Sequence, residues 1–448
     1  MTGRLSDLAE QVLEAAKRAG ADAADTLVMD GTSISIEVRA GALEHAERSE
    51  GVDLGLRVLC GARQACVSIS DDSATSIATM AERAVAMARE APEDPTCGLA
   101  TPDQLAQNWD VAALDLYDDS SAPSPADLER MALEAEAAAL AVDGVTQAQG
   151  AGSGYSETSL FLATSNGFRG GYRRGSYSTS CVAISGEGQK MERDYHGEAR
   201  SHYADLPDAR SIGQLAGERA VARSGATRPP TGAYPVLFDE RIAASLIGHL
   251  VGAINGTAIV RGASFLKDAL GQQVLPKGLS LIENPHRPRV AGSRPFDGEG
   301  LPVNQRALVE DGVLTGWTLD LATGRKLGMD STGNASRGVS APPSPSVGNL
   351  ALTQGDASRD DLIAQMGTGL VITSMIGSTI NPNTGDYSRG ASGFWVENGV
   401  ITGPVNECTV AGNLRDMLMN ITPANDGRAH LSRVVPSLLV EGLTIAGA

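Results

Sequence analysis

The stretch SISIEVR, residues 33–39, alternates polar and apolar side chains, so that Ile34, Ile36 and Val38 recur at every second position. Successive side chains of a strand point to opposite faces of a sheet, and this pattern therefore predicts a strand with one buried face. Other extended runs lie around it, at residues 25–29, 52–59 and 64–69. These runs predict a sheet in the N-terminal part of the chain.

Two helices are expected on either side of these strands. Leu5, Leu8 and Val12 recur at helical spacing before Gly20, and a second amphipathic segment covers residues 73–89. Residues 1–90 are therefore expected to form an N-terminal α+β domain.

A linker and a second α+β domain are expected next. Residues 91–123 are rich in Pro, Asp and Ser, with Trp109 as their one large anchor. The sequence SPAD at residues 124–127 is typical of a helix start, with a hydroxyl cap and proline in the first turn. An Asn-Gly turn at residues 166–167 predicts a hairpin, and helix, strands and closing helix repeat the order of the first domain over residues 124–226.

The region 227–448 consists mostly of short apolar runs separated by Gly, Pro and Asn, with one helical segment at residues 239–254. This pattern predicts a β-rich C-terminal domain, a barrel or sandwich with a few helices. The expected fold class is thus α+β, with helices on antiparallel sheets in the first two domains.

Charge and composition narrow the functional classes. The 448 residues carry a formal net charge of −18 and no basic run, which argues against nucleic-acid binding. Five scattered cysteines make no disulfide framework, and the charged N-terminus does not resemble a signal peptide. Because no long apolar stretch could span a membrane, we expect a cytoplasmic protein without membrane contact.

Motifs alone do not identify a catalytic site. The six histidines include no pair at a familiar zinc spacing, and His249 on the helical segment is more typical of a packed helix residue. Cys408 has no histidine near it in the sequence and is more typical of a small buried hydrophobe. Asp297 and Glu299 could form an acid/base pair, but we interpret DGE as a polar turn because nothing apolar nearby would shift a pKa.

Longer motifs carry more information. They are FDGEGLPVNQRALVEDGVLTGWTLDLATGRKLGMDSTGNASR at residues 296–337, NPNTGDYSRGASGFWVENGVITGPVNECTVAGNL at 381–414, VPSLLVEGLTIAG at 435–447, GVDLGLRVLCGARQACVSISD at 51–71 and ATSNGFRGGY at 163–172. In this order they resemble the TldD/PmbA family of bacterial metallopeptidases, and the resemblance covers essentially the whole chain.

The resemblance implies a function shared between two similar subunits. In this family a TldD-type subunit carries HExxxH on a helix and a cysteine nearer the C-terminus, and these ligands hold a zinc ion whose bound water attacks the peptide. A PmbA-type subunit, also called TldE, pairs with it as a heterodimer around an enclosed chamber. Unfolded peptides and leader peptides are the implied substrates.

This chain departs from the catalytic pattern. The segment ASLIGH, residues 244–249, takes the place of HExxxH, so that Ala244 stands for the first ligand and Ser245 for the general base. Only His249 matches, and residues 425–435 contain no cysteine. The resemblance therefore implies a PmbA-type subunit without metal ligands or cofactor of its own, with zinc expected in its TldD-type partner.

Two other functions remain open at this point. The chain could be a metallopeptidase in its own right, with His249 joined by His286 or His430 as substituted ligands. It could instead be a regulator without enzymatic activity that binds a protein such as DNA gyrase, a target with which the family has been associated. The isolated chain could also form a homodimer.

Overall fold

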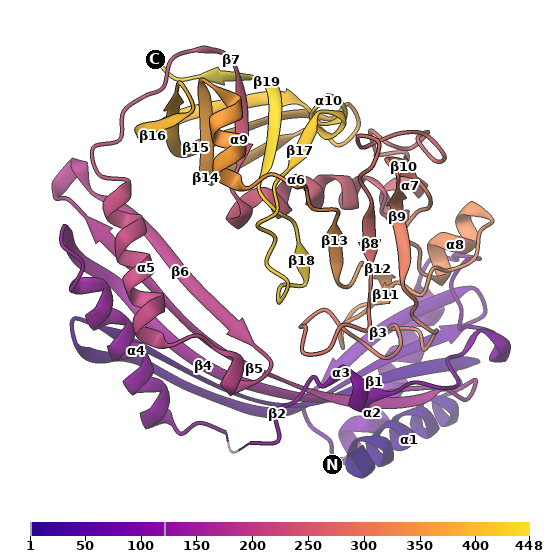
Figure 1. Ribbon diagram of the computed structural model, residues 1–448. Coiled ribbons are helices and arrows are strands. Elements are labelled where there is room, and N and C mark those ends of the chain that lie inside the picture. The colour runs from indigo at the N-terminus through magenta and orange to yellow at the C-terminus, as the bar shows by residue number, and fades with distance from the viewer. Residues whose placement is uncertain (1, 121) are drawn as a thin grey trace.

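The computed structural model describes residues 2–120 and 122–448, with the side chains of residues 2 and 378 left out (Figure 1). It has an α+β fold with a β-rich C-terminal region, which confirms the expected fold class. Six strands form one antiparallel sheet in the order β3-β2-β1-β4-β5-β6. They are β1 (Ala23–Arg39), β2 (Ala42–Cys60), β3 (Arg63–Ile69), β4 (Val145–Thr164), β5 (Arg169–Ser185) and β6 (Glu192–Arg200).

The two expected N-terminal strands are one strand in the structure. Residues 25–29 and 33–39 both belong to β1, and the residues between them stay extended because β2 and β4 pair with β1 along its length. Ile34, Ile36 and Val38 are buried whereas the residues between them are exposed, which confirms the predicted alternation.

Four helices cover one face of this sheet (Figure 1). They are α1 (Thr2–Ala19), α2 (Ala74–Glu90), α4 (Pro125–Leu140) and α5 (Ala209–Ala222). Val28 of β1 packs in the cluster with α1 and α2, whereas Ile36 of the same strand packs in the cluster with α4 and α5. The chain thus repeats helix, three strands and helix, and the two repeats join where β1 pairs with β4.

The connection between the repeats lies against the rest of the molecule. It contains α3 (Val111–Leu114) and one turn of 3-10 helix, Pro102–Gln104. Trp109 packs against Phe168, in the turn between β4 and β5, and against Phe296 of the C-terminal region, with ring centroids 5.5 and 5.2 Å away. Since one sheet runs through both repeats, the division into domains 1–90 and 124–226 stays a prediction.

The C-terminal region contains a closed barrel and a second sheet. The barrel order is β16-β15-β14-β7-β19, closed by pairing of β19 with β16, and β17 extends it beside β19. These strands are β7 (Gly232–Phe238), β14 (Gly369–Ile380), β15 (Asp386–Glu397), β16 (Val400–Asn413), β17 (Ile421–Pro423) and β19 (Leu438–Ala446). The second sheet is β10 (Val313–Leu314), β9 (Arg306–Glu310), β8 (Leu281–Glu283), β13 (Leu350–Leu352) and β18 (Arg433–Val434).

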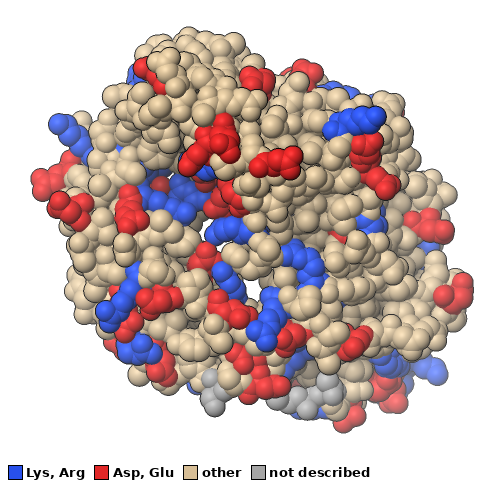
Figure 2. Space-filling model, in the orientation of Figure 1, with Lys and Arg blue, Asp and Glu red and all other residues tan. Residues whose placement is uncertain are grey.

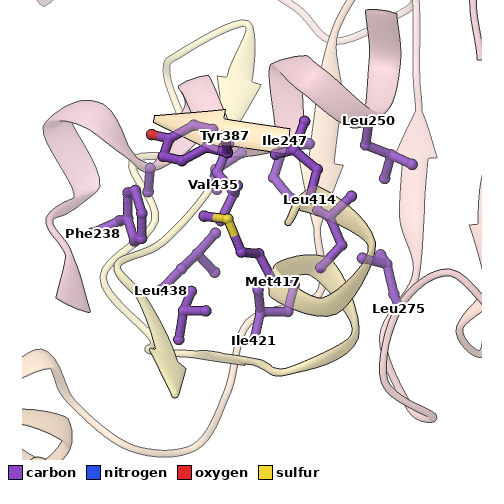
Figure 3. Close-up of a cluster of buried hydrophobic side chains, with 14 of the residues drawn as sticks. Phe238, Ile247, Leu250, Leu275, Tyr387, Leu414, Met417, Ile421, Val435 and Leu438 are labelled. Atoms are coloured by element: carbon purple, nitrogen blue, oxygen red, sulfur yellow. The ribbon is translucent and has the colours of Figure 1, made fainter. Parts of the chain in front are cut away.

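Short elements connect these sheets. They are α6 (Glu240–Ala253), α7 (Gly256–Val260), α8 (Leu321–Leu327), α9 (Arg359–Met366), α10 (Leu414–Met419) and the strand pair β11 (Ala335–Ser336) and β12 (Ser344–Pro345). The main core of the region lies between α6, the barrel and α10, where Phe238, Ile247 and Met417 point toward one another (Figure 3). No helix among the described residues has the length and apolar character needed to cross a membrane.

A buried ionic contact joins the C-terminal region to the sheet. Asp25 of β1 accepts hydrogen bonds from Arg57 of β2, with Nε at 2.7 Å, and from Arg337 after β11. The side chains of all three residues are at most 4% exposed. Gly55 makes this approach feasible, because a Cβ there would collide with the backbone of Val339.

Substituting Asp25→Asn should strongly destabilise the protein, because it leaves two buried guanidinium groups without a charged partner. We expect a loss of about 3–5 kcal/mol in the free energy of unfolding, measured by urea denaturation. The matched control is Asp30→Asn on the same strand, whose exposed contact with Arg4 at 3.5 Å should be worth at most about 1 kcal/mol. Similar losses in both variants would contradict the structural role of the buried contact.

Candidate functional site

Helix α6 carries all three residues that the sequence comparison with HExxxH singled out, Ala244, Ser245 and His249. Asp239 caps its N-terminus by accepting a hydrogen bond from the Arg241 backbone N–H. Its buried face includes Leu246, Ile247 and Leu250, which belong to the barrel core. Ala244, Ser245 and His249 lie beside this face and are only partly buried. The helix matches the segment predicted at residues 239–254.

The polar atoms of this group have no protein partner. The Ser245 hydroxyl and the His249 Nε2 atom are both buried and accept or donate no hydrogen bond within the described residues. Because Ser245 and His249 are four residues apart, they lie on neighbouring turns of one helix face. Ser245 and His249 thus supply the polar side-chain groups of the expected site, because Ala244 has none.

The surroundings of His249 favour an uncharged imidazole. Its ring meets that of Tyr387 edge to face, with centroids 5.7 Å apart. Burial, together with the positive charge of Arg389, lowers the pKa of His249. Burial also raises the pKa of Tyr387 to about 12, so its phenol stays protonated and offers no anionic ligand.

These residues do not fit a catalytic zinc ion. Such a site needs three protein ligands, and Ala244 has no donor atom to accompany His249. Cys408 is buried elsewhere in the barrel, where its thiol donates to the Ala391 carbonyl at 3.2 Å and burial raises its pKa. In the part of the chain that the structure describes, no three His, Cys, Asp or Glu residues are grouped to hold a metal ion.

The substituted ligands that the sequence left open do not meet. His430 Nε2 lies 3.3 Å from Glu198 of β6. His286 lines a cavity with Trp109, near the connection between the two repeats. His249 instead packs against β15. The structure therefore places the three histidines in three different environments.

Residues 297–300 form a turn, as expected, but the expectation that nothing nearby would shift a pKa is wrong. The side chains of Asp297 and Glu299 are both buried, at 2% and 5% exposure. Burial raises the pKa of Asp297 to about 6, and burial together with the Asp297 charge raises the pKa of Glu299 to about 8. The loop is folded into the interior by the C-terminal region around it, which the local sequence does not reveal.

The carboxyl groups of Asp297 and Glu299 both accept hydrogen bonds from backbone N–H groups of nearby loops. Asp297 accepts hydrogen bonds from the backbone N–H groups of Glu299 and Leu301, each at 2.9 Å, and of Ala335 at 3.0 Å. Glu299 accepts one from Leu321 at 2.9 Å, at the start of α8. Their contacts therefore position loops of the C-terminal region.

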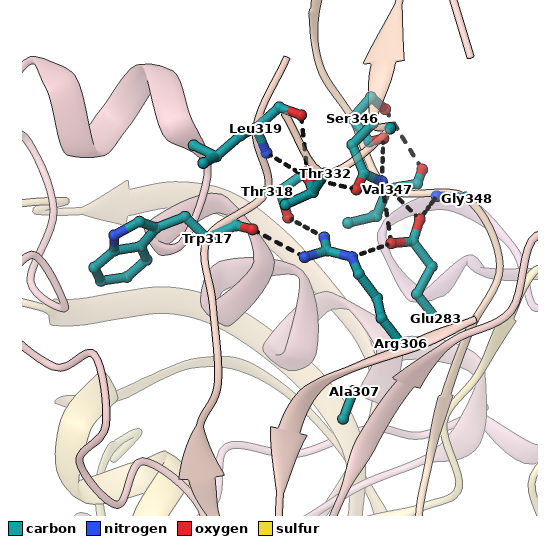
Figure 4. A network of polar contacts seen from close by, with 12 residues as sticks. Glu283, Arg306, Ala307, Trp317, Thr318, Leu319, Thr332, Ser346, Val347 and Gly348 are labelled. Carbon is teal, nitrogen blue, oxygen red and sulfur yellow. Dashed lines mark hydrogen bonds and ion pairs between the residues drawn. The ribbon is translucent and has the colours of Figure 1, made fainter. Parts of the chain in front are cut away.

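A second buried network holds the same loops from the other side (Figure 4). Glu283 accepts hydrogen bonds from Arg306 at 3.0 Å, from the amide of Asn334 at 2.9 Å and from the Gly348 backbone N–H at 2.6 Å. Arg306 also donates to the Trp317 carbonyl at 2.9 Å. The long motif at residues 296–337 thus builds the loops that face the first sheet.

Family sequence models match three parts of the chain. PmbA/TldA metallopeptidase domain 1 covers residues 24–88, the central domain covers 118–224 and the C-terminal domain covers 231–447. The chain belongs to the PmbA/TldD metallopeptidase family.

Curated relatives of this PmbA/TldD-family chain agree over nearly its whole length. The metalloprotease PmbA of Escherichia coli is 36% identical over 428 residues, which cover 95% of this chain and 92% of that protein. The metalloprotease PmbA homolog of Haemophilus influenzae is also 36% identical, over 97% of this chain and 94% of the homolog.

Solved structures of similar proteins have the same fold. A protein of Bacteroides thetaiotaomicron, described as a candidate modulator of DNA gyrase, superimposes with a TM-score of 0.91 at 28% identity, over 99% of this chain and 98% of that one. TldE from Thermococcus kodakarensis superimposes with a TM-score of 0.84 over 98% of this chain and 100% of that one. At 19% identity, the second likeness concerns the fold alone.

The raised pKa of Glu299 has a consequence for stability. A carboxyl group that stays protonated in the folded state but ionises when unfolded stabilises the fold at low pH, and this stabilisation is lost as pH rises toward 8. In Glu299→Gln, which cannot ionise, the free energy of unfolding should fall less between pH 5 and pH 8.5, by at least about 1 kcal/mol.

Urea denaturation at both pH values measures this difference. Glu310→Gln provides the control, because Glu310 is exposed on β9 and its replacement should leave the pH dependence unchanged. If the Glu299 variant followed the wild-type pH dependence, the buried carboxyl group would be ionised throughout that range.

Proposed function

We propose that this chain is the non-catalytic subunit of a two-subunit peptide hydrolase of the cytoplasm. It pairs with a zinc-bearing TldD-type chain, completes the chamber in which unfolded peptides or leader peptides are cut, and leaves hydrolysis to that partner. The observation that carries the proposal is the chemistry of α6, where Ala244 and Ser245 replace a metal ligand and a general base.

The remaining polar groups on α6 support this division of labour. Hydrolysis of a peptide bond needs an activated water and a group that takes its proton. Ser245 and His249 make no hydrogen bond to each other, and no carboxylate among the described residues lies within salt-bridge distance of His249 to orient its ring. The helix thus lacks a serine nucleophile hydrogen-bonded to a histidine base, and it also lacks the ligands of a zinc site.

The shape of the molecule supports the role in forming a chamber. Figure 2 shows a deep hollow near the centre of the molecule, and Figure 1 places the first sheet and the C-terminal region around that part of the view. The helices cover the other face of the sheet, so that its uncovered face is turned toward the C-terminal region.

Small residues line part of that uncovered face. Across β1, β4 and β5, Ser35 pairs with Gly154 and Gly154 with Ser178, and the neighbouring row joins Ser33, Ser156 and Ser176. Side chains of this size leave main chain and hydroxyl groups accessible, which suits a substrate that is bound in an extended form regardless of its sequence.

Mixing this chain with its TldD-type partner tests the proposal directly. We expect the partner alone to cleave an unstructured peptide slowly and the mixture to cleave it at least about tenfold faster, because the chamber is then complete. His249→Phe in this chain keeps the aromatic contact with Tyr387 and should leave the stimulated rate within about twofold. Equal cleavage with and without this chain would refute the proposal.

Metal content separates the proposal from independent catalysis. The purified chain, expressed with ample zinc, should contain far less than one zinc ion per molecule, because one imidazole is too weak a site. Mass spectrometry of the metals in wild type and in His249→Phe should give the same low value. One zinc ion per chain that disappears in the variant would show a site with substituted ligands.

A further inference from the structure

A cavity between the first sheet and the loops of the C-terminal region combines positive charge with apolar walls. It has a volume of about 220 Å³ and is lined by Arg174 of β5 and by Arg294 and Arg337 of the C-terminal loops. Apolar side chains complete the walls, among them those of Leu27, Leu160 and Phe296. None of these residues belongs to α6.

Two of the arginines form no ion pair among the described residues. Arg174 donates to the carbonyl oxygens of Ala291 at 3.3 Å and Ser293 at 2.8 Å. Arg294 donates at 3.3 to 3.5 Å to three carbonyl oxygens, those of Ala335, Gly333 and Ser346. Neither guanidinium group lies within 4.0 Å of a carboxylate in the described part of the chain, although the protein as a whole carries a net charge of −18.

The third arginine adds to the excess of positive charge. Arg337 shares the carboxylate of Asp25 with Arg57, so that two cations face one anion. The only carboxylate lining the cavity, that of Asp297, already accepts three backbone hydrogen bonds.

Each arginine also keeps one free donor group. The Nε atoms of Arg174 and Arg294 and the Nη2 atom of Arg337 are buried and have no acceptor among the described residues. Buried donors without an acceptor are costly, and guanidinium groups bind carboxylates closely because both are planar. Three such donors from three segments of the chain therefore favour an anion that comes from outside.

The apolar walls indicate what else the ligand carries. Tyr172 and Phe296 meet edge to face with ring centroids 5.7 Å apart, and the Arg174 guanidinium lies 5.3 Å from the Tyr172 ring centre. A bare anion would leave this apolar surface without contact. The volume is roughly that of seven water molecules, which suits a single amino-acid residue.

We propose that this cavity binds the C-terminal carboxylate of a peptide whose last side chain is apolar. The carboxylate meets the free donors of Arg174 and Arg294, and the side chain lies against Phe296 and Leu160. The peptide as ligand rests on the proposed function in peptide hydrolysis.

Calorimetric titration of the full chain tests the proposal with two probes, the tripeptide Gly-Gly-Leu with a free carboxylate and the same tripeptide with a C-terminal amide. We expect the free acid to bind at least about tenfold more tightly, because one charge-assisted hydrogen bond accounts for that factor or more. Arg174→Gln and Arg294→Gln should each weaken binding of the free acid by about tenfold to a hundredfold.

Arg173→Gln is the matched control. Arg173 adjoins Arg174 on β5 but points to the other face, where it contacts Glu157 at 2.6 Å and the ring of Tyr117. The Arg173→Gln variant should therefore bind the free-acid tripeptide with the same affinity as the wild type. Urea denaturation of all three variants identifies any loss of binding that comes from unfolding, and Arg294→Lys, which keeps the charge, should retain more affinity than Arg294→Gln.

Several results would overturn the proposal: equal binding of acid and amide, binding of neither, or unchanged affinity in both arginine variants. Binding of inorganic phosphate in place of the free acid would also overturn it, in favour of a small-anion site. The outcome is separable from the proposed subunit function, because the titration uses this chain alone and the cleavage assay uses the mixture. Normal binding without stimulation of cleavage would refute only the subunit role.

Discussion

Asp25 is the single carboxylate shared by Arg57 of the sheet and Arg337 of the C-terminal region, in a place where the side chains are almost completely buried. Buried ions are tolerated only when they are closely paired, so the C-terminal region can pack only where Arg337 reaches Asp25. That position also sets the space between the sheet and the C-terminal loops. The cavity is bounded by this contact, since Arg337 is one of the residues that line it.

Local features of the fold could be predicted from the sequence. The alternation of Ile34, Ile36 and Val38 and the spacing of apolar residues along α6 are short-range signals, and both elements occur where they were expected. The pairing of β1 with β4 joins residues more than 100 positions apart, for instance Ile34 with Tyr155. No local pattern encodes such a partner, which is why two sheets were expected where one exists.

In the candidate site, too, local features could be predicted from the sequence and long-range ones could not. The resemblance located Ala244, Ser245 and His249 because a motif is a local arrangement, and the structure places them together on one helix. The burial of Asp297 and Glu299 depends on loops that come from other parts of the chain. Likewise, Arg174 and Arg294 are 120 residues apart in the sequence, and only the folded chain shows that their charges lack partners.

The packing of α6 rests on residues other than the three that the resemblance aligns with HExxxH. Leu246, Ile247 and Leu250 fill the barrel core, where truncation of one such side chain costs about 2–5 kcal/mol. Ala244, Ser245 and His249 lie at the margin of that core and contribute little to it. The helix and the barrel therefore depend little on which residues occupy positions 244, 245 and 249.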